Sequence, residues 1–278
     1  MIDFTPSPVA LQVGPISIFW YGICYAVGLA GGYWVMAREA RRRGLDASLI
    51  SNGMIVVALA ALAGGRLYHV IDQWALYKDD LPRIVLPPYT GLGAYGGLLT
   101  GVIALFLYAR YRRLEFWTWA DIAAPAVFVM QGVARWGNFF NQELYGPPTD
   151  LPWGIAIQCA KRIPADACPP GSDPLATLGQ HFHPLFLYES ISGILGALVL
   201  LYLARRFAGR IRPGDLTAVL FIWYGVVRFG LETLRSNNWT FNGIPTAQLV
   251  SVAFILAGVV ILAIRHRPRT VDAAAPPA

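Results

Sequence analysis

Residues 248–264 read QLVSVAFILAGVVILAI, seventeen positions without a charged side chain, and Arg265, Arg267 and Arg269 follow directly. A helix that crosses about 30 Å of hydrocarbon needs about 20 mostly apolar residues, so this stretch predicts a membrane-spanning helix with a basic end. Six further segments share this character: residues 16–37, 49–74, 92–108, 117–133, 184–203 and 216–234. The sequence therefore predicts an all-α integral membrane protein, a bundle of seven transmembrane helices.

The composition supports a membrane protein. Hydrophobic residues make up 56% of the 278 positions and charged residues only 14%, which is too apolar for a water-soluble globular protein. The net charge of +6 does not indicate nucleic-acid binding, because the basic residues lie in short clusters between apolar segments. The first fifteen residues contain no Lys or Arg, so we expect no cleaved signal peptide.

The basic clusters predict the orientation. Fourteen of the 22 basic residues lie in every second connection or just after the last segment: Arg38, Arg41, Arg42, Arg43, Arg110, Arg112, Arg113, Arg205, Arg206, Arg210, Arg212, Arg265, Arg267 and Arg269. Short cytoplasmic loops are enriched in Lys and Arg. We therefore expect the N-terminus outside and the C-terminus in the cytoplasm.

The longest connection, residues 146–182, is rich in Pro and Gly and is expected to form an outer-side cap on a single membrane domain, residues 1–267. Residues 268–278 are expected to be a disordered cytoplasmic tail. Cys159 and Cys168 lie nine positions apart in the cap. They can form a disulfide if the cap faces an oxidising compartment; the alternative is that they are free thiols.

Four arginines lie inside or at the edge of apolar segments: Arg66, Arg135, Arg228 and Arg235. An arginine at the centre of a membrane costs about 2.5–3.5 kcal/mol, so each should face the bundle interior or a water-filled cavity and have a partner. Their guanidinium groups either form structural ion pairs or bind an anion. Because arginine is a planar, permanently charged fork that matches phosphate oxygens, we expect a phospholipid-handling site.

Two patterns place polar groups together. Arg135, Asn138 and Asn141 are spaced by three and would line one side of a helix. Tyr224, Arg228, Glu232 and Arg235 are spaced by four, four and three, which predicts one helical stripe. If Glu232 neutralises one arginine of this stripe, the other is left for an anion; the alternative is a structural triad.

The sequence has no HExxH, no G-x-S-x-G, no Walker motif and no closely spaced carboxylates for a divalent metal, so we expect a metal-independent reaction. Two other classes of protein compete with an enzyme. A retinal pump needs a lysine inside a span, and both lysines lie in loops. A transporter of an anionic solute would also use paired arginines and stays open at this point.

Residues 135–146, RWGNFFNQELYG, resemble the signature R-x-G-N-F-x-N-x-E-x-x-G of the bacterial prolipoprotein diacylglyceryl transferases. The resemblance covers nearly the whole chain. Further similar elements follow in the same order: Trp20-Tyr21-Gly22, Gly65-Arg66, Gly96-Gly97, His183-Pro184, Leu187-Tyr188-Glu189, Tyr224-Gly225, Arg228-Phe229 and Glu232.

The resemblance implies a seven-helix enzyme of the bacterial inner membrane that needs no cofactor. It implies transfer of the diacylglyceryl group of phosphatidylglycerol to the lipobox cysteine thiol near the signal peptide of a prolipoprotein, releasing glycerol phosphate. The expected catalytic residues are Arg135, Arg228, Tyr95 and Glu143. The expected substrate-binding residues, besides Arg135, are Asn138, Asn141, Gly146, Tyr21, Arg66, Gly96, Gly97, His183, Tyr188, Glu189, Tyr224, Glu232 and Arg235.

One position departs from the family pattern. Many members have a histidine before the paired glycines, and this sequence has Tyr95. A tyrosine, with an ordinary pKa near 10, needs neighbouring cations to act as a general base. The alternative, which we favour, is that no protein base is needed, because a guanidinium group lowers the pKa of the substrate thiol.

Overall fold

The computed structural model describes residues 1–14, 16–84, 93–235 and 240–267, except the side chains of Ile16, Ala94 and Tyr95. The expected disordered tail, residues 268–278, lies outside the described residues. Contacts between Cα atoms divide the chain into two compact units. The large unit consists of Met1–Val35 and Ala120–Ala278, and the small unit of Met36–Trp119.

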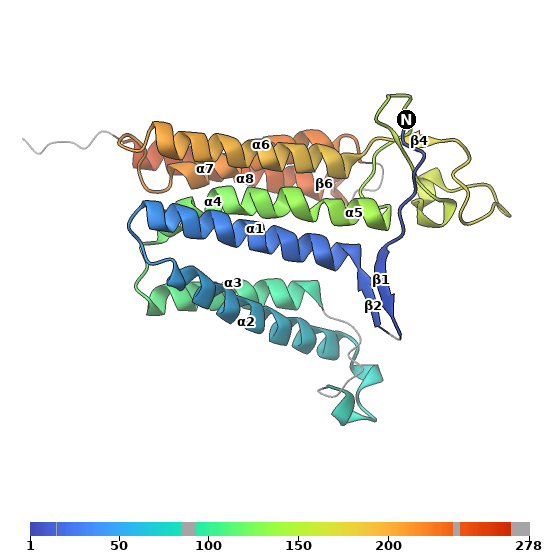
Figure 1. Cartoon of the computed structure of the whole chain (residues 1–278), viewed down its shortest axis with the longest axis horizontal. Helices are drawn as coiled ribbons and strands as arrows, with labels where there is room; N and C mark the ends of the chain where they lie inside the picture. The colour runs from blue at the N-terminus through green and yellow to red at the C-terminus, as the bar shows by residue number, and fades with distance from the viewer. Residues whose placement is uncertain (15, 85–92, 236–239, 268–278) are drawn as a thin grey trace, which may run out of the picture. The chain divides into compact units, whose positions relative to one another are not determined.

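Seven long helices lie within the described residues, as the apolar segments predicted (Figure 1). They are α1 (Trp20–Arg42), α2 (Ser48–Asp72), α3 (Ala94–Tyr111), α4 (Phe116–Ala134), α6 (Leu185–Arg206), α7 (Asp215–Glu232) and α8 (Thr246–Arg265). Their bounds differ from the predicted ones by a few residues.

The helices present apolar side chains on their surfaces. Leu59 of α2, Phe106 of α3 and Leu198 of α6 are all more than half exposed, which suits contact with lipid and not with water. By length and composition, α2, α6 and α8 are able to cross a membrane, and Gly96–Tyr111 of α3 is a shorter apolar helix, among the residues described. That all seven helices cross the membrane stays a prediction.

Several short elements were not predicted. The N-terminal hairpin pairs β1 (Val9–Val13) with β2 (Ile16–Phe19), so the predicted first helix begins four residues late, at Trp20. The sequence ISIF of β2 alternates apolar and polar residues at its start, as a strand does, and β1 supplies the hydrogen-bonding partner. The six-residue helix α5 (Trp136–Asn141) follows α4 almost directly.

The cap contains only short elements. They are β3 (Ile155–Ala156), paired with β4 (His181–Phe182), and the 3-10 turns η3 (Cys159–Lys161) and η4 (Pro164–Asp166). A second small hairpin, β5 (Thr240–Phe241) with β6 (Ile244–Pro245), precedes α8. In the small unit, η1 (Trp74–Leu76) and η2 (Leu81–Ile84) follow α2.

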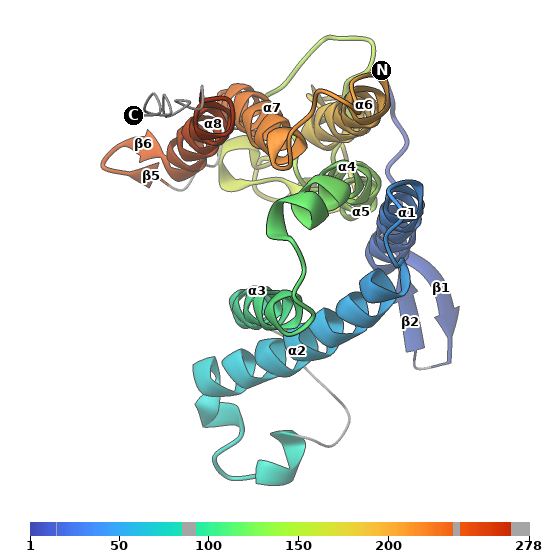
Figure 2. The ribbon, with the colours of Figure 1, turned by 90° about the vertical axis from the view of Figure 1, so that its left-hand side faces the viewer.

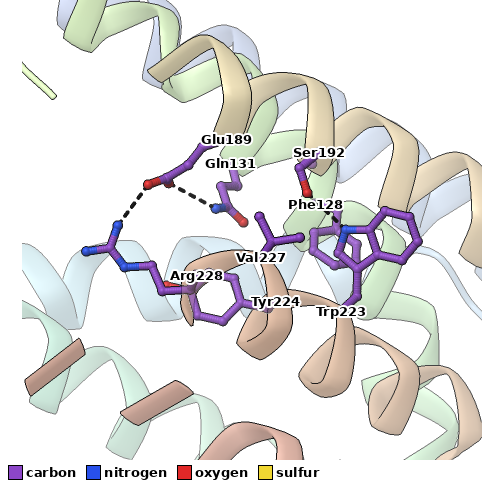
Figure 3. Close-up of a pocket in the computed structure, with 9 residues that line it drawn as sticks. Phe128, Gln131, Glu189, Ser192, Trp223, Tyr224, Val227 and Arg228 are labelled. Carbon is purple, nitrogen blue, oxygen red and sulfur yellow. Dashed lines mark hydrogen bonds and ion pairs between the residues drawn. The ribbon is translucent and has the colours of Figure 1, made fainter. Parts of the chain in front are cut away.

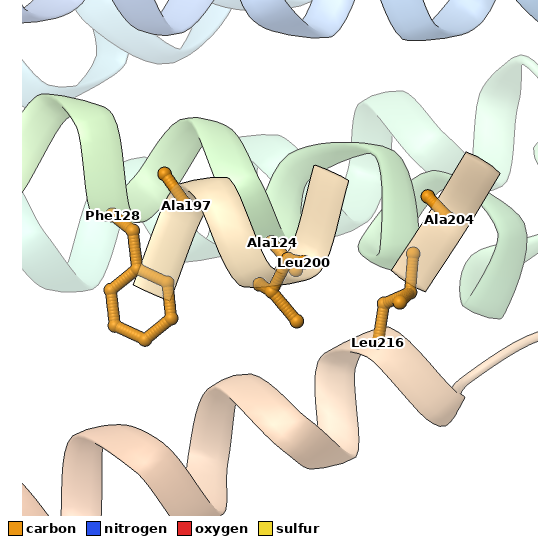
Figure 4. Packing of buried hydrophobic residues seen from close by; sticks show 6 residues of the cluster. All are labelled: Ala124, Phe128, Ala197, Leu200, Ala204 and Leu216. Atoms are coloured by element: carbon orange, nitrogen blue, oxygen red, sulfur yellow. The ribbon is translucent and has the colours of Figure 1, made fainter. Parts of the chain in front are cut away.

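In the large unit, α4, α6 and α7 share a buried apolar cluster (Figure 4). Its members are Ala124, Phe128, Ala197, Leu200, Ala204 and Leu216. Lipid tails are as apolar as leucine, so close packing and not water exclusion holds such helices together. A Cβ on Gly193 of α6 would lie 3.0 Å from the carbonyl oxygen of Phe128 in α4, which shows how closely the two backbones approach.

One end of the large unit is held by a cluster of hydrogen bonds. The carboxylate of Asp121, in α4, is almost fully buried and accepts hydrogen bonds from the backbone N–H groups of Gly214 and Thr217 and from the Thr217 hydroxyl. These N–H groups lie at the start of α7 and have no partner within that helix. Asp215 contacts the ring of His266 at the end of α8, with an N–O distance of 3.0 Å. We call these residues the Asp121 cluster.

In the small unit, α2 and α3 pack against each other (Figure 2). A Cβ on Gly96 would clash with the carbonyl oxygen of Gly64, and the Thr100 hydroxyl donates a hydrogen bond to Ala60 O over 2.8 Å. The Tyr108 hydroxyl donates to Leu49 O, also over 2.8 Å. Small residues and hydroxyl groups thus form this helix interface.

Candidate functional site

The site begins at the junction of α4 and α5. Arg135 occupies the single position between the two helices. The side-chain amides of Asn138 and Asn141 both donate to Oε1 of Glu143, over 2.9 and 3.3 Å. The two asparagines therefore lie on one side of α5, as their spacing predicted. A Cβ on Gly137 would lie 2.8 Å from the ring of Tyr21, so a glycine is needed where α1 meets α5.

A chain of ion pairs crosses from the junction of α4 and α5 to α7. One carboxylate oxygen of Glu189, in α6, lies 2.6 Å from Arg135, and the other lies 2.8 Å from Arg228, in α7. Glu232 lies 2.8 Å from Arg228 and 4.0 Å from Arg235. The side chains of Glu189 and Glu232 are 3% and 2% exposed, whereas those of Arg135 and Arg228 are 27% and 16% exposed. We call these five residues the arginine cluster.

The arginine cluster adds a partner to the stripe on α7. The sequence left open whether Glu232 neutralises one arginine and leaves the other for an anion, or whether the three residues form a structural triad. Glu232 is within ion-pair distance of both Arg228 and Arg235, and Arg228 has Glu189 as a second partner. The sequence did not show this because Glu189 comes from another helix, 39 positions before Arg228.

The cluster nevertheless keeps a net positive charge. Three guanidinium groups face two carboxylates, which leaves one positive charge. The Nε atom of Arg135 is buried and has no hydrogen-bond partner among the residues described. A buried donor without a partner is costly, so this N–H is well placed to bind a ligand oxygen.

A small pocket lies beside Glu189 and Arg228 (Figure 3). Its volume is about 10 Å³, about the space that one water molecule needs, so a phospholipid does not fit in it as it stands. Gln131 and Tyr224 also line it, and the Gln131 amide lies 3.5 Å from Glu189. Sequence reasoning did not single out Gln131. Its position one helical turn before Arg135, in an apolar helix, was the available signal.

A second polar group lies at the start of α6. The hydroxyl of Tyr188 accepts a hydrogen bond from the indole of Trp153 over 2.8 Å and lies 3.0 Å from Nδ1 of His183. A Cβ on Gly146 would lie 3.1 Å from the His183 side chain and 2.8 Å from the carbonyl oxygen of Leu234, just after α7. Gly146 therefore allows the start of the cap to pass between α6 and the end of α7.

Four expected site residues belong to the small unit. Arg66 donates to the carbonyl oxygens of Arg83 and Ile84, over 2.7 and 3.0 Å, and so holds η2. Gly96 and Gly97 lie where α3 packs against α2. The side chain of Tyr95 lies outside the described residues. The substrate roles expected for these residues stay predictions.

The cap is held by a disulfide and by polar contacts. Cys159 and Cys168 are bonded, which settles the alternative that the sequence left open. The hydroxyl of Tyr145 accepts a hydrogen bond from the backbone N–H of Ile163 over 2.6 Å, and burial raises the pKa of Tyr145. In the part of the chain that the structure describes, no three His, Cys, Asp or Glu side chains lie together as a metal site would require.

Comparison with known proteins gives one consistent result. Residues 8–264 match the family described as prolipoprotein diacylglyceryl transferase. The phosphatidylglycerol–prolipoprotein diacylglyceryl transferase of Streptococcus uberis is 35% identical over 270 residues, which cover 97% of each chain. The enzyme of the same name from Synechococcus elongatus is 34% identical over 93% of this chain and 87% of its own, and that of Trichormus variabilis is 35% identical over 95% and 92%.

The family match includes residues 135–146 and every residue of the arginine cluster. The resemblance that these residues predicted is confirmed over nearly the whole chain. This chain belongs to the prolipoprotein diacylglyceryl transferase family, whose members are membrane-bound transferases.

Proposed function

We propose that the chain transfers the diacylglyceryl group of phosphatidylglycerol to the thiol of a cysteine in the lipobox of a prolipoprotein. The sulfur of the thiolate attacks the glyceryl carbon that carries the phosphate. A carbon–sulfur bond forms, the carbon–oxygen bond to phosphate breaks, and glycerol phosphate leaves with the bonding electron pair. The observation that carries this proposal is the arginine cluster, with its net positive charge and the unpartnered Nε of Arg135.

The arginine cluster suits the charge change of this reaction. A phosphodiester carries one negative charge, which the surplus positive charge of the cluster balances. The leaving phosphate monoester gains a second negative charge as the carbon–oxygen bond breaks. Arginines that are already held in place by Glu189 and Glu232 need little rearrangement to stabilise this charge, which is the most effective form of electrostatic catalysis.

We infer that Arg135 and Arg228 bind the phosphate and that the same positive charge activates the thiol. A cysteine thiol has an ordinary pKa of about 8.5, and nearby guanidinium groups lower it. A thiolate therefore forms at the site without a dedicated base. Glu143, which holds Asn138 and Asn141, shapes the side of the site formed by α5.

We further propose that the protein crosses the bacterial inner membrane seven times and that the arginine cluster lies toward the outer side. Two observations support this orientation. The Cys159–Cys168 disulfide indicates that the cap faces an oxidising compartment. The cap directly follows α5, whose neighbour Arg135 belongs to the arginine cluster.

The first test is Arg135→Ala. Loss of a charge-stabilising donor typically lowers kcat by about 100-fold to 1,000-fold, and we expect at least the lower figure. The measurement is the mass gain of a lipobox peptide in vesicles that contain phosphatidylglycerol. Arg206→Ala, which removes an exposed arginine near the end of α6, is the matched control and should transfer normally. Near-normal transfer by Arg135→Ala would overturn the assignment of Arg135.

A further inference from the structure

A second, larger pocket lies in the large unit and is lined in part by Glu143, the partner of Asn138. Its volume is about 490 Å³, which is within the usual range of ligand-binding pockets. Residues from three segments line it: Pro8 and Phe19 of the N-terminal hairpin region, Asn141 and Glu143, and Lys161 and Arg162 of the cap. The arginine cluster does not explain this pocket, and its lining lies outside the long helices.

Gln142 holds the three segments in place. Its backbone is left-handed, with φ at 55°, and its side chain is buried. The side-chain amide donates to the carbonyl oxygen of Pro6 over 3.2 Å and to Oε1 of Gln158 over 2.9 Å, and it accepts from the Gln158 N–H over 2.9 Å. Cys159, the residue after Gln158, forms the disulfide with Cys168. The pocket is therefore preformed, which lowers the entropic cost of binding.

The two basic residues of the pocket differ in what they contact. Arg162 donates to the carbonyl oxygens of Ile157 and Thr177 and to the side chain of Gln180, so its guanidinium group is committed to the cap. Lys161 is exposed and has neither an ion pair nor a side-chain hydrogen bond with any residue that the structure describes. The pocket thus presents one uncommitted positive charge.

We infer that this pocket binds the acceptor polypeptide just after its cysteine, and that Lys161 makes the enzyme prefer an acidic side chain there. This inference rests on the proposed function. An apolar leader segment stays in the bilayer, whereas the chain after the cysteine enters water and can reach loops outside the spans. Glu143 lines the pocket and accepts a hydrogen bond from Asn138, whose backbone N–H donates to the carbonyl oxygen of Arg135 over 3.1 Å. The pocket is therefore connected to the arginine cluster, where we propose that the thiol reacts.

The polar groups of the pocket match a polypeptide better than a lipid. The ammonium group of Lys161 can donate to a backbone carbonyl or to a carboxylate. The carboxylate of Glu143 and the amide oxygen of Asn141 can accept from backbone N–H groups. Phe19 and Pro8 provide apolar surface for a side chain. A second phosphate site would instead be expected to contain an arginine that is not already saturated by protein oxygens.

The test is charge reversal at Lys161, read out with two acceptors. The acceptors are lipobox peptides that carry either Asp or Lys two positions after the cysteine. We expect wild-type protein to have the lower KM for the Asp peptide. Lys161→Glu should shift the ratio of the two KM values by about tenfold toward the Lys peptide. In this variant the exposed side chain at position 161 repels the Asp of one peptide and attracts the Lys of the other. The KM for phosphatidylglycerol should change less than about twofold.

Lys78→Glu is the matched control, because Lys78 is the only other lysine and is also exposed. It should leave the KM ratio unchanged. A KM ratio that does not shift in Lys161→Glu, or that shifts equally in Lys78→Glu, overturns the inference while the proposed function stands. If wild-type protein transfers nothing to either peptide, the proposed function fails as well.

A second variant tests how Lys161 is positioned. Cys159→Ser combined with Cys168→Ser removes the disulfide beside Lys161. We expect the preference for the Asp peptide to fall at least threefold, while transfer to both peptides continues. Full retention of the preference in the double variant contradicts a role for the bonded loop in holding Lys161.

Discussion

Glu189 is the residue on which the arginine cluster depends. Its two carboxylate oxygens contact Arg135, at the junction of α4 and α5, and Arg228, in α7, and its side chain is only 3% exposed. Without this negative charge, two guanidinium groups would face each other in a poorly hydrated place. Glu189 therefore fixes the distance between the two guanidinium groups that we propose to bind phosphate.

We predict that Glu189→Gln lowers both stability and activity. Removing one partner of a buried ion pair costs about 3–5 kcal/mol, and the partial exposure of the two arginines reduces this to about 2–3 kcal/mol. Transfer should fall at least about tenfold, because Arg135 and Arg228 lose their common anchor. The measurements are thermal unfolding in detergent and the peptide mass gain.

Asp80→Asn is the control for Glu189→Gln. It removes a carboxylate from an exposed ion pair with Arg83, which should contribute less than about 1 kcal/mol. If Glu189→Gln is as stable and as active as Asp80→Asn, then the ion pairs of Glu189 contribute little to the site.

The residues of the site were predictable to the extent that they are polar groups in apolar segments. Arg135, Arg228 and Glu232 stood out for that reason, and the spacing of Asn138 and Asn141 predicted their shared side. The pairing of Glu189 with both arginines was not predictable, because it depends on how α5, α6 and α7 pack.

At the scale of elements, the contact between α7 and α8 depends on glycines. A Cβ on Gly225 of α7 would lie 2.7 Å from the backbone carbonyl oxygen of Ser251 in α8. On the same pair of helices, a Cβ on Gly258 would lie 2.6 Å from the carbonyl oxygen of Ala218. Backbone atoms cannot turn aside as a side chain can, so a larger residue must move the helices apart.

We predict that Gly225→Ala destabilises the protein by about 1–3 kcal/mol, the usual cost of overpacking. Gly230→Ala is the control, because a Cβ at Gly230 of the same helix meets nothing within 4 Å. This control should be neutral or stabilising by up to about 1 kcal/mol, since alanine favours a helix. Equal unfolding temperatures for the two variants would show that α7 and α8 pack less closely at Gly225 than the distance to the Ser251 carbonyl oxygen indicates.

Long elements were predictable and short ones were not. An apolar segment of about 20 residues is a strong signal, so all seven long helices were expected near their observed bounds. The strand β2 was assigned to a helix because ISIF continues the apolar segment of α1. The two-residue strands of the cap are too short for any periodic pattern, and the spacing of Asn138 and Asn141 predicted a helical side but not a separate helix α5.

For the whole molecule, the Asp121 cluster bears on the direction of the helices. It brings the start of α7 and the end of α8 together with Asp121, near the start of α4. Arg212, before α7, also donates a hydrogen bond to the carbonyl oxygen of Arg265. The basic residues that flank α7 and α8 therefore lie at one end of the large unit.

This arrangement makes the orientation testable with two matched variants. In a Cys24→Ala background, Gly209→Cys places a thiol beside the basic residues that precede α7, and Leu175→Cys places one in the exposed part of the cap. The native disulfide does not react with a maleimide. If the cap faces outward, a membrane-impermeant maleimide should label the Leu175→Cys protein in intact cells. Because basic loops remain in the cytoplasm, the same reagent should label the Gly209→Cys protein only after the membrane is permeabilised. The opposite pattern would place the arginine cluster on the cytoplasmic side, where a disulfide in the cap would be unexpected.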